Sequence, residues 1–297
     1  GCGHNLIAVS AVAAGVALAA ALNGQKGRVS IIGAPDEENR GGKVDLVNTG
    51  VFDDVDVAMM FHPGCSTNIQ TESLASCDYQ FIFHGRNAHA ARNPWQGRNA
   101  LDAVIQTFNN INALRQHLKD DVRIHGIISE GGLAPNIIPD RAVADFCIRA
   151  LDKNYLYEVI ERVTACARGA ATATGTTLEV NESTNPYDAM LNNKTLAGIF
   201  AESLDEVGIE IKSRYDEGRG SIDMGNVSRV TPSIYPVVAI TNDWVTRHTS
   251  EFAALCNTDK PYEIMLTVGK AMALTGLKVI QDKGLQKEIK REFERNQ

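Results

Sequence analysis

The sequence has 297 residues, of which 44% are hydrophobic and 22% are charged, and its formal net charge is −7. The length and the ordinary composition indicate a soluble protein of about two domains, and the lack of any Lys/Arg-rich block argues against a nucleic-acid partner. Six cysteines are scattered without close spacing. Because a chain of this length can form its core without disulfides, we expect reduced thiols in a cytoplasmic protein.

The first predicted element is an apolar helix over residues 6–22, LIAVSAVAAGVALAAAL. Its length is about right for a membrane span, but Ala and Gly dominate it and no basic residues precede it. We therefore predict a buried helix packed on a sheet, and no membrane partner. The chain opens on GCGHN without an initiator Met, and we expect that a preceding segment is missing from it.

An α/β pattern follows this helix. Residues 28–34, RVSIIGA, and residues 55–61, VDVAMMF, are nearly continuous apolar runs, and a short helical stretch around residues 44–49 separates them. Such runs are typical of parallel strands that are covered by helices on both faces of the sheet.

The pattern changes from about residue 74, where apolar and polar residues begin to alternate as in an antiparallel strand. The predicted elements are a strand at 76–85, a helix at 99–118, strands at 123–129 and 142–151, a helix at 155–171 and a strand at 177–183. This β-α-β-β-α-β order predicts a ferredoxin-like sandwich. It interrupts the α/β pattern and is therefore predicted to be an inserted domain.

The α/β pattern returns with a helix at 194–207, a strand at 233–240 and a long C-terminal helix from about residue 261. The predicted fold is therefore an α/β domain with a mostly parallel sheet and helices on both faces, plus an inserted ferredoxin-like α+β domain. The α/β domain would comprise residues 1–73 and 185–297, and the insert residues 74–184.

Side chains that can bind metal cluster at the predicted ends of the parallel strands, where open α/β sheets bind their ligands. Four separate segments contribute them: Cys2 and His4 before the first helix, Glu37 and Glu38 after strand 28–34, His62 after strand 55–61, and His248 in the loop after strand 233–240. Taken singly, each has an ordinary structural explanation, such as a buried thiol or an exposed acidic turn. The hypothesis of a site rests on their convergence.

This donor set suits divalent cations, because imidazole and thiolate favour borderline-soft ions and a carboxylate compensates charge. Five protein ligands are more than one tetrahedral ion needs, so the set predicts two ions about 3.5–4 Å apart. Successive side chains in an extended segment face opposite ways. One residue of the Glu37–Glu38 pair can therefore bind metal while the other acts as general base.

Seven motifs in this order resemble those of a co-catalytic metallopeptidase family, the aminoacylase and carboxypeptidase superfamily. They are GCGHN, GAPDEENRGGK, FHPG, HAARNPWQGRNALDA, APNIIPDRAVADFCIRA, GSIDMGNVS and RHTSEF. The sequence is most similar to the branch of amidohydrolases that split p-aminobenzoyl-glutamate, indole-acetyl-amino acids and other N-acyl amino acids or dipeptides. The motifs cover most of the chain, although the family's chain normally begins earlier and many relatives have Asp where this sequence has Asn5.

The resemblance implies a role for each matching residue. Cys2, His4, Glu38, His62 and His248 would bind two divalent ions, with Cys2 between them, and Glu37 would be the general base. His89 of the inserted domain would reach across a homodimer formed through residues 74–184 and polarise the scissile carbonyl. Asn136 and Arg149 would hold the substrate carboxylate, for which an arginine fork is a suitable partner.

The sequence therefore predicts a metal-dependent amidase that acts on an N-acyl amino acid, a p-aminobenzoyl-glutamate-type conjugate or a dipeptide. Its donor set would accept Zn²⁺, Mn²⁺ or Co²⁺. The alternatives are a catalytically inactive metal-binding or regulatory subunit with the same fold, and a protein with a single structural metal. A nucleotide-dependent oxidoreductase is disfavoured because GCGHN lacks the GxGxxG spacing.

Overall fold

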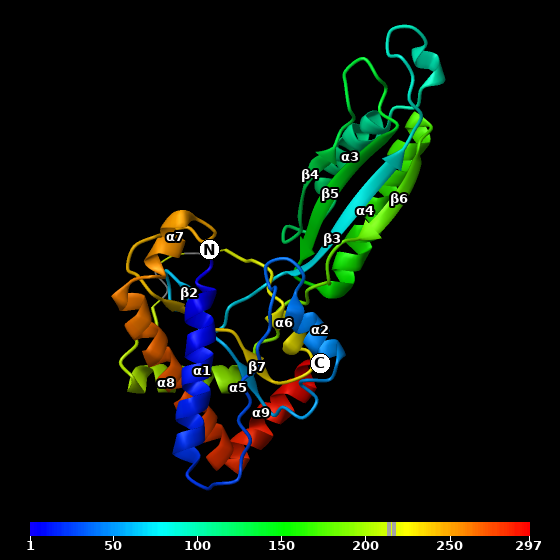
Figure 1. The fold of residues 1–297 in the computed structure, drawn as a ribbon. Helices are drawn as coiled ribbons and strands as arrows, with labels where there is room; N and C mark the ends of the chain where they lie inside the picture. The colour runs from blue at the N-terminus through cyan, green and yellow to red at the C-terminus, as the bar shows by residue number, and fades with distance from the viewer. Residues whose placement is uncertain (213–214, 216–217) are drawn as a thin grey trace. The chain divides into compact units, whose positions relative to one another are not determined.

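The computed structural model describes residues 1–212, 215 and 218–297 (Figure 1). The described chain divides into two compact units. The first unit comprises Gly1–Glu37, Gly42–Ser73 and Met190–Gln297, and the second comprises Glu38–Gly41 and Leu74–Ala189. The predicted domain bounds, 1–73 with 185–297 and 74–184, stay a prediction about which parts fold independently.

The first unit contains two short parallel strand pairs. β1 (Ala58–Met59) pairs with β7 (Ser233–Ile234), and β2 (His62–Gly64) pairs with β8 (Val237–Ala239). The predicted strands 55–61 and 233–240 are thus each divided in two, and the sheet is smaller than predicted. In the predicted strand 233–240, Pro236 lies between β7 and β8 and has no backbone N–H to donate to the ladder.

The predicted strand at residues 28–34 does not form in the structure. This segment is not assigned to any strand, and Ile31 is 50% exposed with its side chain against Gly15 of helix α1 (His4–Leu22). An apolar run becomes a strand only where another strand offers a hydrogen-bonding ladder. Among the described residues, this run lies beside a helix instead.

The described residues of the first unit form seven helices: α1, α2 (Gly42–Asn48), α5 (Lys194–Glu206), α6 (Met224–Val227), α7 (Ser250–Leu255), α8 (Asp259–Gln281) and α9 (Lys283–Asn296). Their core includes Phe61, Phe200, Phe252 and Val268. The predicted single C-terminal helix is two helices, because Asp282 is extended and its carboxylate accepts hydrogen bonds from Gly284 N and Leu285 N at the start of α9.

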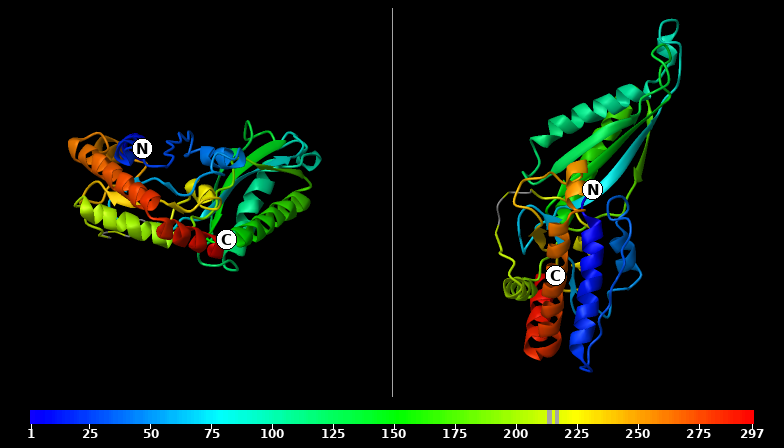
Figure 2. Two further views of the ribbon diagram at one scale, coloured as in Figure 1. Left: turned by 90° about the horizontal axis from the view of Figure 1, so that it is seen from below. Right: turned by 60° about the vertical axis from the view of Figure 1, so that its left-hand side comes forward.

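Helix α1 packs along α8, and the two lie side by side in the right-hand view of Figure 2. Glycines of α8 permit the close approach, since a Cβ at Gly276 would lie 2.5 Å from Leu18.

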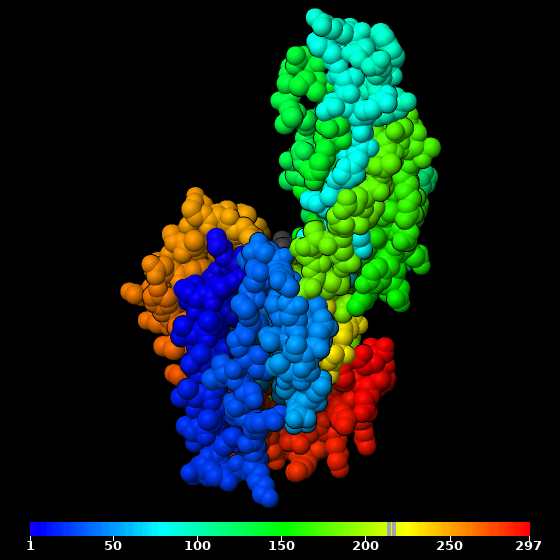
Figure 3. All heavy atoms as spheres, turned by 45° about the vertical axis from the view of Figure 1, so that its right-hand side comes forward, coloured from blue at the N-terminus to red at the C-terminus, as the bar shows by residue number. Residues whose placement is uncertain are grey.

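The prediction that α1 is buried is wrong: it lies at the surface (blue in Figure 3), and Val16 is 62% exposed. By length and composition α1 could also span a membrane, and 28% of its apolar window is buried.

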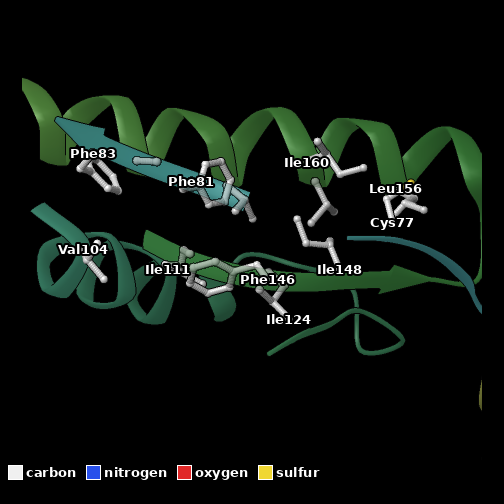
Figure 4. Packing of buried hydrophobic residues seen from close by; sticks show 14 of the residues in the cluster. Cys77, Phe81, Phe83, Val104, Ile111, Ile124, Phe146, Ile148, Leu156 and Ile160 are labelled. Carbon is white, nitrogen blue, oxygen red and sulfur yellow. The ribbon is translucent and has the colours of Figure 1, made fainter. Parts of the chain in front are cut away.

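The second unit is the predicted ferredoxin-like sandwich. Its antiparallel sheet has the order β4 (Arg123–Glu130), β5 (Arg141–Ala150), β3 (Ala75–His84) and β6 (Thr177–Glu182). Helices α3 (Ala100–Arg115) and α4 (Lys153–Thr174) cover one face. Figure 4 shows side chains from β3, β5, α3 and α4 meeting in this core, where the rings of Phe108 and Phe146 lie 4.6 Å apart.

Polar side chains set where several helices begin. Asn99 accepts hydrogen bonds from the first-turn backbone of α3, Asp152 from that of α4, Asn193 from that of α5 and Thr249 from that of α7. Each satisfies a backbone N–H that has no partner within the helix, which stabilises the helix by about 1 kcal/mol.

Candidate metal centre

Four of the five predicted metal ligands come together within the first unit. Cys2 Sγ lies 3.3 Å from His248 Nε2. The ligand atoms of Cys2, His4 and His62 all lie within 4.8 Å of one another. Cys2 therefore lies close both to His248 and to the His4–His62 pair.

Cys2 and His4 are held at the start of α1 by the backbone of Gly3. Gly3 is left-handed, with φ of 76°, and a Cβ there would lie 2.8 Å from both Cys256 Sγ and Pro63 Cγ. Both the conformation and the crowding favour glycine. The CGH spacing thus turns the chain sharply, so that a thiol and an imidazole can face the same space.

His62 is the first residue of β2, next to Val237 of β8, and its ring is buried. Its Nδ1 lies 2.8 Å from Pro63 O, which can only accept, so Nδ1 donates and Nε2 keeps its lone pair. Burial, followed by the charge of Arg247, lowers the pKa of His62 to about 3. The ring is therefore neutral at physiological pH, which is the form that binds a metal.

Two other parts of the site contain non-glycine residues in the left-handed region. His248 has φ of 63°, and Asp36, directly before Glu37, has φ of 61°. Such a conformation costs on the order of 1–3 kcal/mol and persists only where the surroundings impose it. At His248, one constraint is the hydrogen bond that its backbone N donates to Gly1 O over 3.2 Å.

Glu37 lies beside the cluster, with Oε2 3.9 Å from His4 Nε2 and about a quarter of its side chain exposed. The sequence predicted that Glu37 follows a strand, but in the structure it lies in the loop before α2. Glu38 is its neighbour in the chain and groups by contacts with the second unit. Its role as the fifth ligand stays a prediction.

The donor set fits divalent metal ions. A thiol and three imidazoles converge, and one imidazole is buried, neutral and oriented by a backbone carbonyl. Metal-binding histidines characteristically donate their other ring N–H in this way. The shared position of Cys2 fits the prediction that its sulfur lies between two ions.

His89 and Asn136 lie next to each other in the second unit. The backbone of His89 is bridged to that of Ile137, and Ala90 N donates to Asn136 O over 3.0 Å. Both His89 and Asn136 line a pocket with Asn87, Ala88 and Ile137. His89 Nδ1 accepts from Ala91 N and Arg92 N at 3.2 and 3.3 Å. Its Nε2 therefore carries the proton and can donate a hydrogen bond.

Arg149 is not brought together with Asn136 in this chain. Arg149 pairs with Ser76 at the start of β3, whereas His89 and Asn136 lie in loops beyond the opposite end of that strand. Its Nε donates to Cys147 Sγ over 3.3 Å on the sheet face that the helices leave open. A carboxylate held by both Arg149 and Asn136 of one chain is incompatible with this arrangement.

The comparisons with known proteins agree on one family. A family model described as a peptidase dimerisation domain matches residues 71–174. The chain is 36% identical over 299 residues to the Xaa-Arg dipeptidase of Mus musculus, a match that covers 98% of this chain and 69% of that protein. The chain belongs to the M20 peptidase family.

Two further comparisons extend this result. A p-aminobenzoyl-glutamate hydrolase subunit of Escherichia coli K12 is 37% identical over 212 residues, covering 70% of this chain and 44% of that protein. The YXEP protein of Bacillus subtilis, described as a dinuclear metal-binding peptidase from the M20 family, shares the fold with a TM-score of 0.64 at 18% identity. That match covers 93% of this chain and 73% of the other. The named relatives are hydrolases and peptidases, and this M20 chain is a metallo-hydrolase.

The structure adds residues to this M20 site that the sequence did not single out. The ring of Tyr235 lies 5.7 Å from that of His62, and burial, then the charge of Glu37, raises the pKa of Tyr235 well above its ordinary value. The positive charge of Arg247 acts to lower the pKa of both His62 and Tyr235. The sequence signal that could have identified Tyr235 is a tyrosine inside the apolar run SIYPVVAI, because a buried tyrosine hydroxyl usually forms a hydrogen bond with a polar neighbour.

Proposed function

We propose that this M20 chain hydrolyses an amide bond in a small substrate: a dipeptide, an N-acyl amino acid or a p-aminobenzoyl-glutamate-type conjugate. The observation that carries the proposal is the convergence of Cys2, His4, His62 and His248 with Glu37 beside them. The names of the mouse and bacterial relatives support the substrate classes. The description of the YXEP protein supports two metal ions.

Cys2, His4, Glu38, His62 and His248 would hold the two ions, with Zn²⁺, Mn²⁺ or Co²⁺ as the candidates. When bound, such ions polarise the substrate carbonyl and lower the pKa of water. Glu37 accepts the proton of the attacking water and later delivers it to the leaving amine. Its position next to His4 and its partial exposure suit a group that must reach water.

His89 would act as a hydrogen-bond donor to the carbonyl oxygen as negative charge develops on it. Its Nε2–H is set by the two backbone groups that donate to Nδ1. Asn136 beside it would bind the substrate carboxylate. Since Arg149 lies at the other end of the sheet from Asn136, we assign the two residues to different chains of a homodimer.

The second unit would form this homodimer. The match to a peptidase dimerisation domain supports it, and so does strand β4. β4 is an edge strand with large exposed apolar side chains, Ile127 at 64% and Ile128 at 44%. An edge of this kind is a template for pairing with another chain.

A catalytically inactive or regulatory subunit is the second candidate. It is favoured by the name of the Escherichia coli relative, which describes one subunit of a hydrolase. Such a subunit would bind metal and dimerise but would release no product from any amide when purified alone.

Elemental analysis and a substrate panel of the wild type and Glu37→Gln test the proposal. We expect two ions per chain in both proteins, and turnover of at least one Xaa-Arg dipeptide, p-aminobenzoyl-glutamate or N-acyl amino acid by the wild type alone. Loss of a general base lowers kcat by about 10²–10⁴-fold. The matched control is Glu158→Gln, an exposed glutamate of α4, which should keep wild-type kcat.

Unchanged turnover in Glu37→Gln would remove Glu37 from the mechanism. Two ions with no turnover of any panel substrate by the wild type would favour the inactive subunit. Fewer than two ions would contradict the two-metal site.

A further inference from the structure

Glu37, the proposed general base, lies on a loop whose two ends are close together. This loop, residues 35–42, brings its two ends together: a Cβ at Gly42 would lie 2.0 Å from Pro35 O, a distance that only a glycine avoids. Glu37 is two residues from one end. The orientation of its carboxylate therefore depends on how firmly the residues that follow the loop are held.

The residue after this closure is Lys43, which forms a buried ion pair with Asp223. Its Nζ lies 2.8 Å from Asp223 Oδ1, and its backbone N donates to Asp223 Oδ2 over 3.0 Å. The exposed fractions of the two side chains are 11% and 1%. One carboxylate thus binds both the ammonium group and the main chain of the same residue.

Asp223 belongs to the motif GSIDMGNVS, to which the mechanism has assigned no role. It occupies the N-cap position of α6 but makes no capping hydrogen bond there. Its carboxylate instead accepts the backbone N–H of Lys43 in the first turn of α2, which packs against α6. A carboxylate at a helix N-terminus also stabilises the helix dipole. Asp223 therefore fixes the start of α2, and with it the end of the loop.

A buried ion pair is weak as a source of stability, because desolvation offsets the attraction and apolar residues of similar volume often serve equally well. What such a pair does supply is one defined arrangement of the two segments it joins. Here the segments are α6 and the residues directly after the loop of Glu37.

We propose that the Lys43–Asp223 ion pair is a positioning device for Glu37, an inference that rests on the proposed function. The pair anchors the end of loop 35–42, the Pro35–Gly42 contact transmits that anchor to the start of the loop, and Glu37 is held beside His4. Neither Lys43 nor Asp223 touches the substrate.

The test compares Lys43→Met, Lys43→Arg and Asp223→Asn with the wild type. A misplacement of a catalytic group by about 1 Å costs up to about 100-fold in rate. We therefore expect Lys43→Met and Asp223→Asn to lower kcat by about 10- to 100-fold, with KM within about twofold and metal content unchanged. Lys43→Arg restores the charge pair and should recover most of kcat. The milder Asp223→Asn keeps the test decisive should Lys43→Met fail to fold.

Glu292→Gln is the matched control, because Glu292 is another buried acid of the first unit that joins two helices. It accepts hydrogen bonds from Lys194 N and Thr195 N at the start of α5, far along the chain from the loop. We expect this variant to lose stability and to keep wild-type kcat. Equal loss of kcat in Glu292→Gln would reduce the role of the ion pair to general stability.

Hydrogen–deuterium exchange of residues 35–42 gives a readout that does not need turnover. Amides of this loop should exchange faster in Asp223→Asn than in wild type, and at the wild-type rate in Glu292→Gln. If the wild type hydrolyses no amide, the proposed function fails, while faster exchange still supports the anchoring of the loop. Wild-type exchange and wild-type kcat in both ion-pair variants would overturn the inference.

Discussion

Gly3 lies between two predicted ligands, Cys2 and His4, and its backbone is left-handed with φ of 76°. A methyl group at this position would meet Cys256 Sγ and Pro63 Cγ, so it would displace the start of α1 as well as strain the backbone. The strain costs on the order of 1–3 kcal/mol. The displacement of the start of α1 would also move Cys2 and His4, the two predicted metal ligands on either side of Gly3.

We expect Gly3→Ala to weaken metal binding by about tenfold or more, as changes next to ligands commonly do. Gly24→Ala is the control, because Gly24 is also left-handed, with φ of 86°, but has open space around it. Both variants should lose stability in thermal melts, and only Gly3→Ala should lose affinity in a Co²⁺ titration. Equal affinities would show that the position of Gly3 does not govern the site.

Among the elements, α9 contributes a buried carboxylate, that of Glu292, which binds the start of α5. It accepts from Lys194 N and from both the backbone N and the hydroxyl of Thr195. Burial alone would raise the pKa of Glu292, but these hydrogen bonds outweigh burial and hold the pKa below its ordinary value of 4.5. The folded state therefore favours the charged form of Glu292.

This lowered pKa fixes the sign of a pH dependence. The stabilisation by Glu292 is complete above pH 4.5 and is lost as the pH falls through the lower pKa of the folded state. Glu292→Gln should therefore cost about 2 kcal/mol of unfolding free energy at pH 7 and progressively less below pH 4.5. Urea unfolding at several pH values measures the difference. Glu294→Gln, in an exposed pair with Lys290, should change the unfolding free energy by less than about 1 kcal/mol.

The elements of the second unit could be predicted from the sequence almost completely. Its strands alternate apolar and polar residues and its helices carry one apolar stripe, so local pattern and global packing agree. The first unit was harder. The apolar run at residues 28–34 has strand composition, but composition does not supply a ladder partner, and the uniform apolarity of α1 did not reveal which of its faces would be covered.

The sequence predicted that four candidate metal ligands converge, but it did not predict the geometry of the candidate metal centre. The convergence of Cys2, His4, His62 and His248 followed from motif order and from two strand pairs that do form. Glu37 arrives by another route, a loop closed at Gly42, because the strand expected before it is absent. A tyrosine inside an apolar run indicates that its hydroxyl has a polar neighbour, but no local pattern identifies that neighbour of Tyr235 as His62, which is distant in sequence.

At the scale of the whole molecule, the proposed chemistry divides between two chains. Four of the predicted ligands (Cys2, His4, His62 and His248) and Glu37 belong to the first unit, whereas His89 and Asn136 belong to the second. Arg149 and Asn136 lie toward opposite ends of one sheet, so a shared substrate carboxylate requires a second copy of the chain. Oligomeric state and activity should therefore change together.

Ile127→Asp tests this coupling. A charge on the exposed edge strand β4 opposes pairing with another chain, so we expect a shift from dimer to monomer in light scattering. The same variant should lose turnover and keep two ions per chain, because none of the predicted ligands lies on β4. Leu266→Asp, at an exposed position of α8, should remain a dimer with wild-type turnover. A fully active monomer would contradict the contribution of His89 and Asn136 across the dimer, and the substrate carboxylate would then need its partners within a single chain.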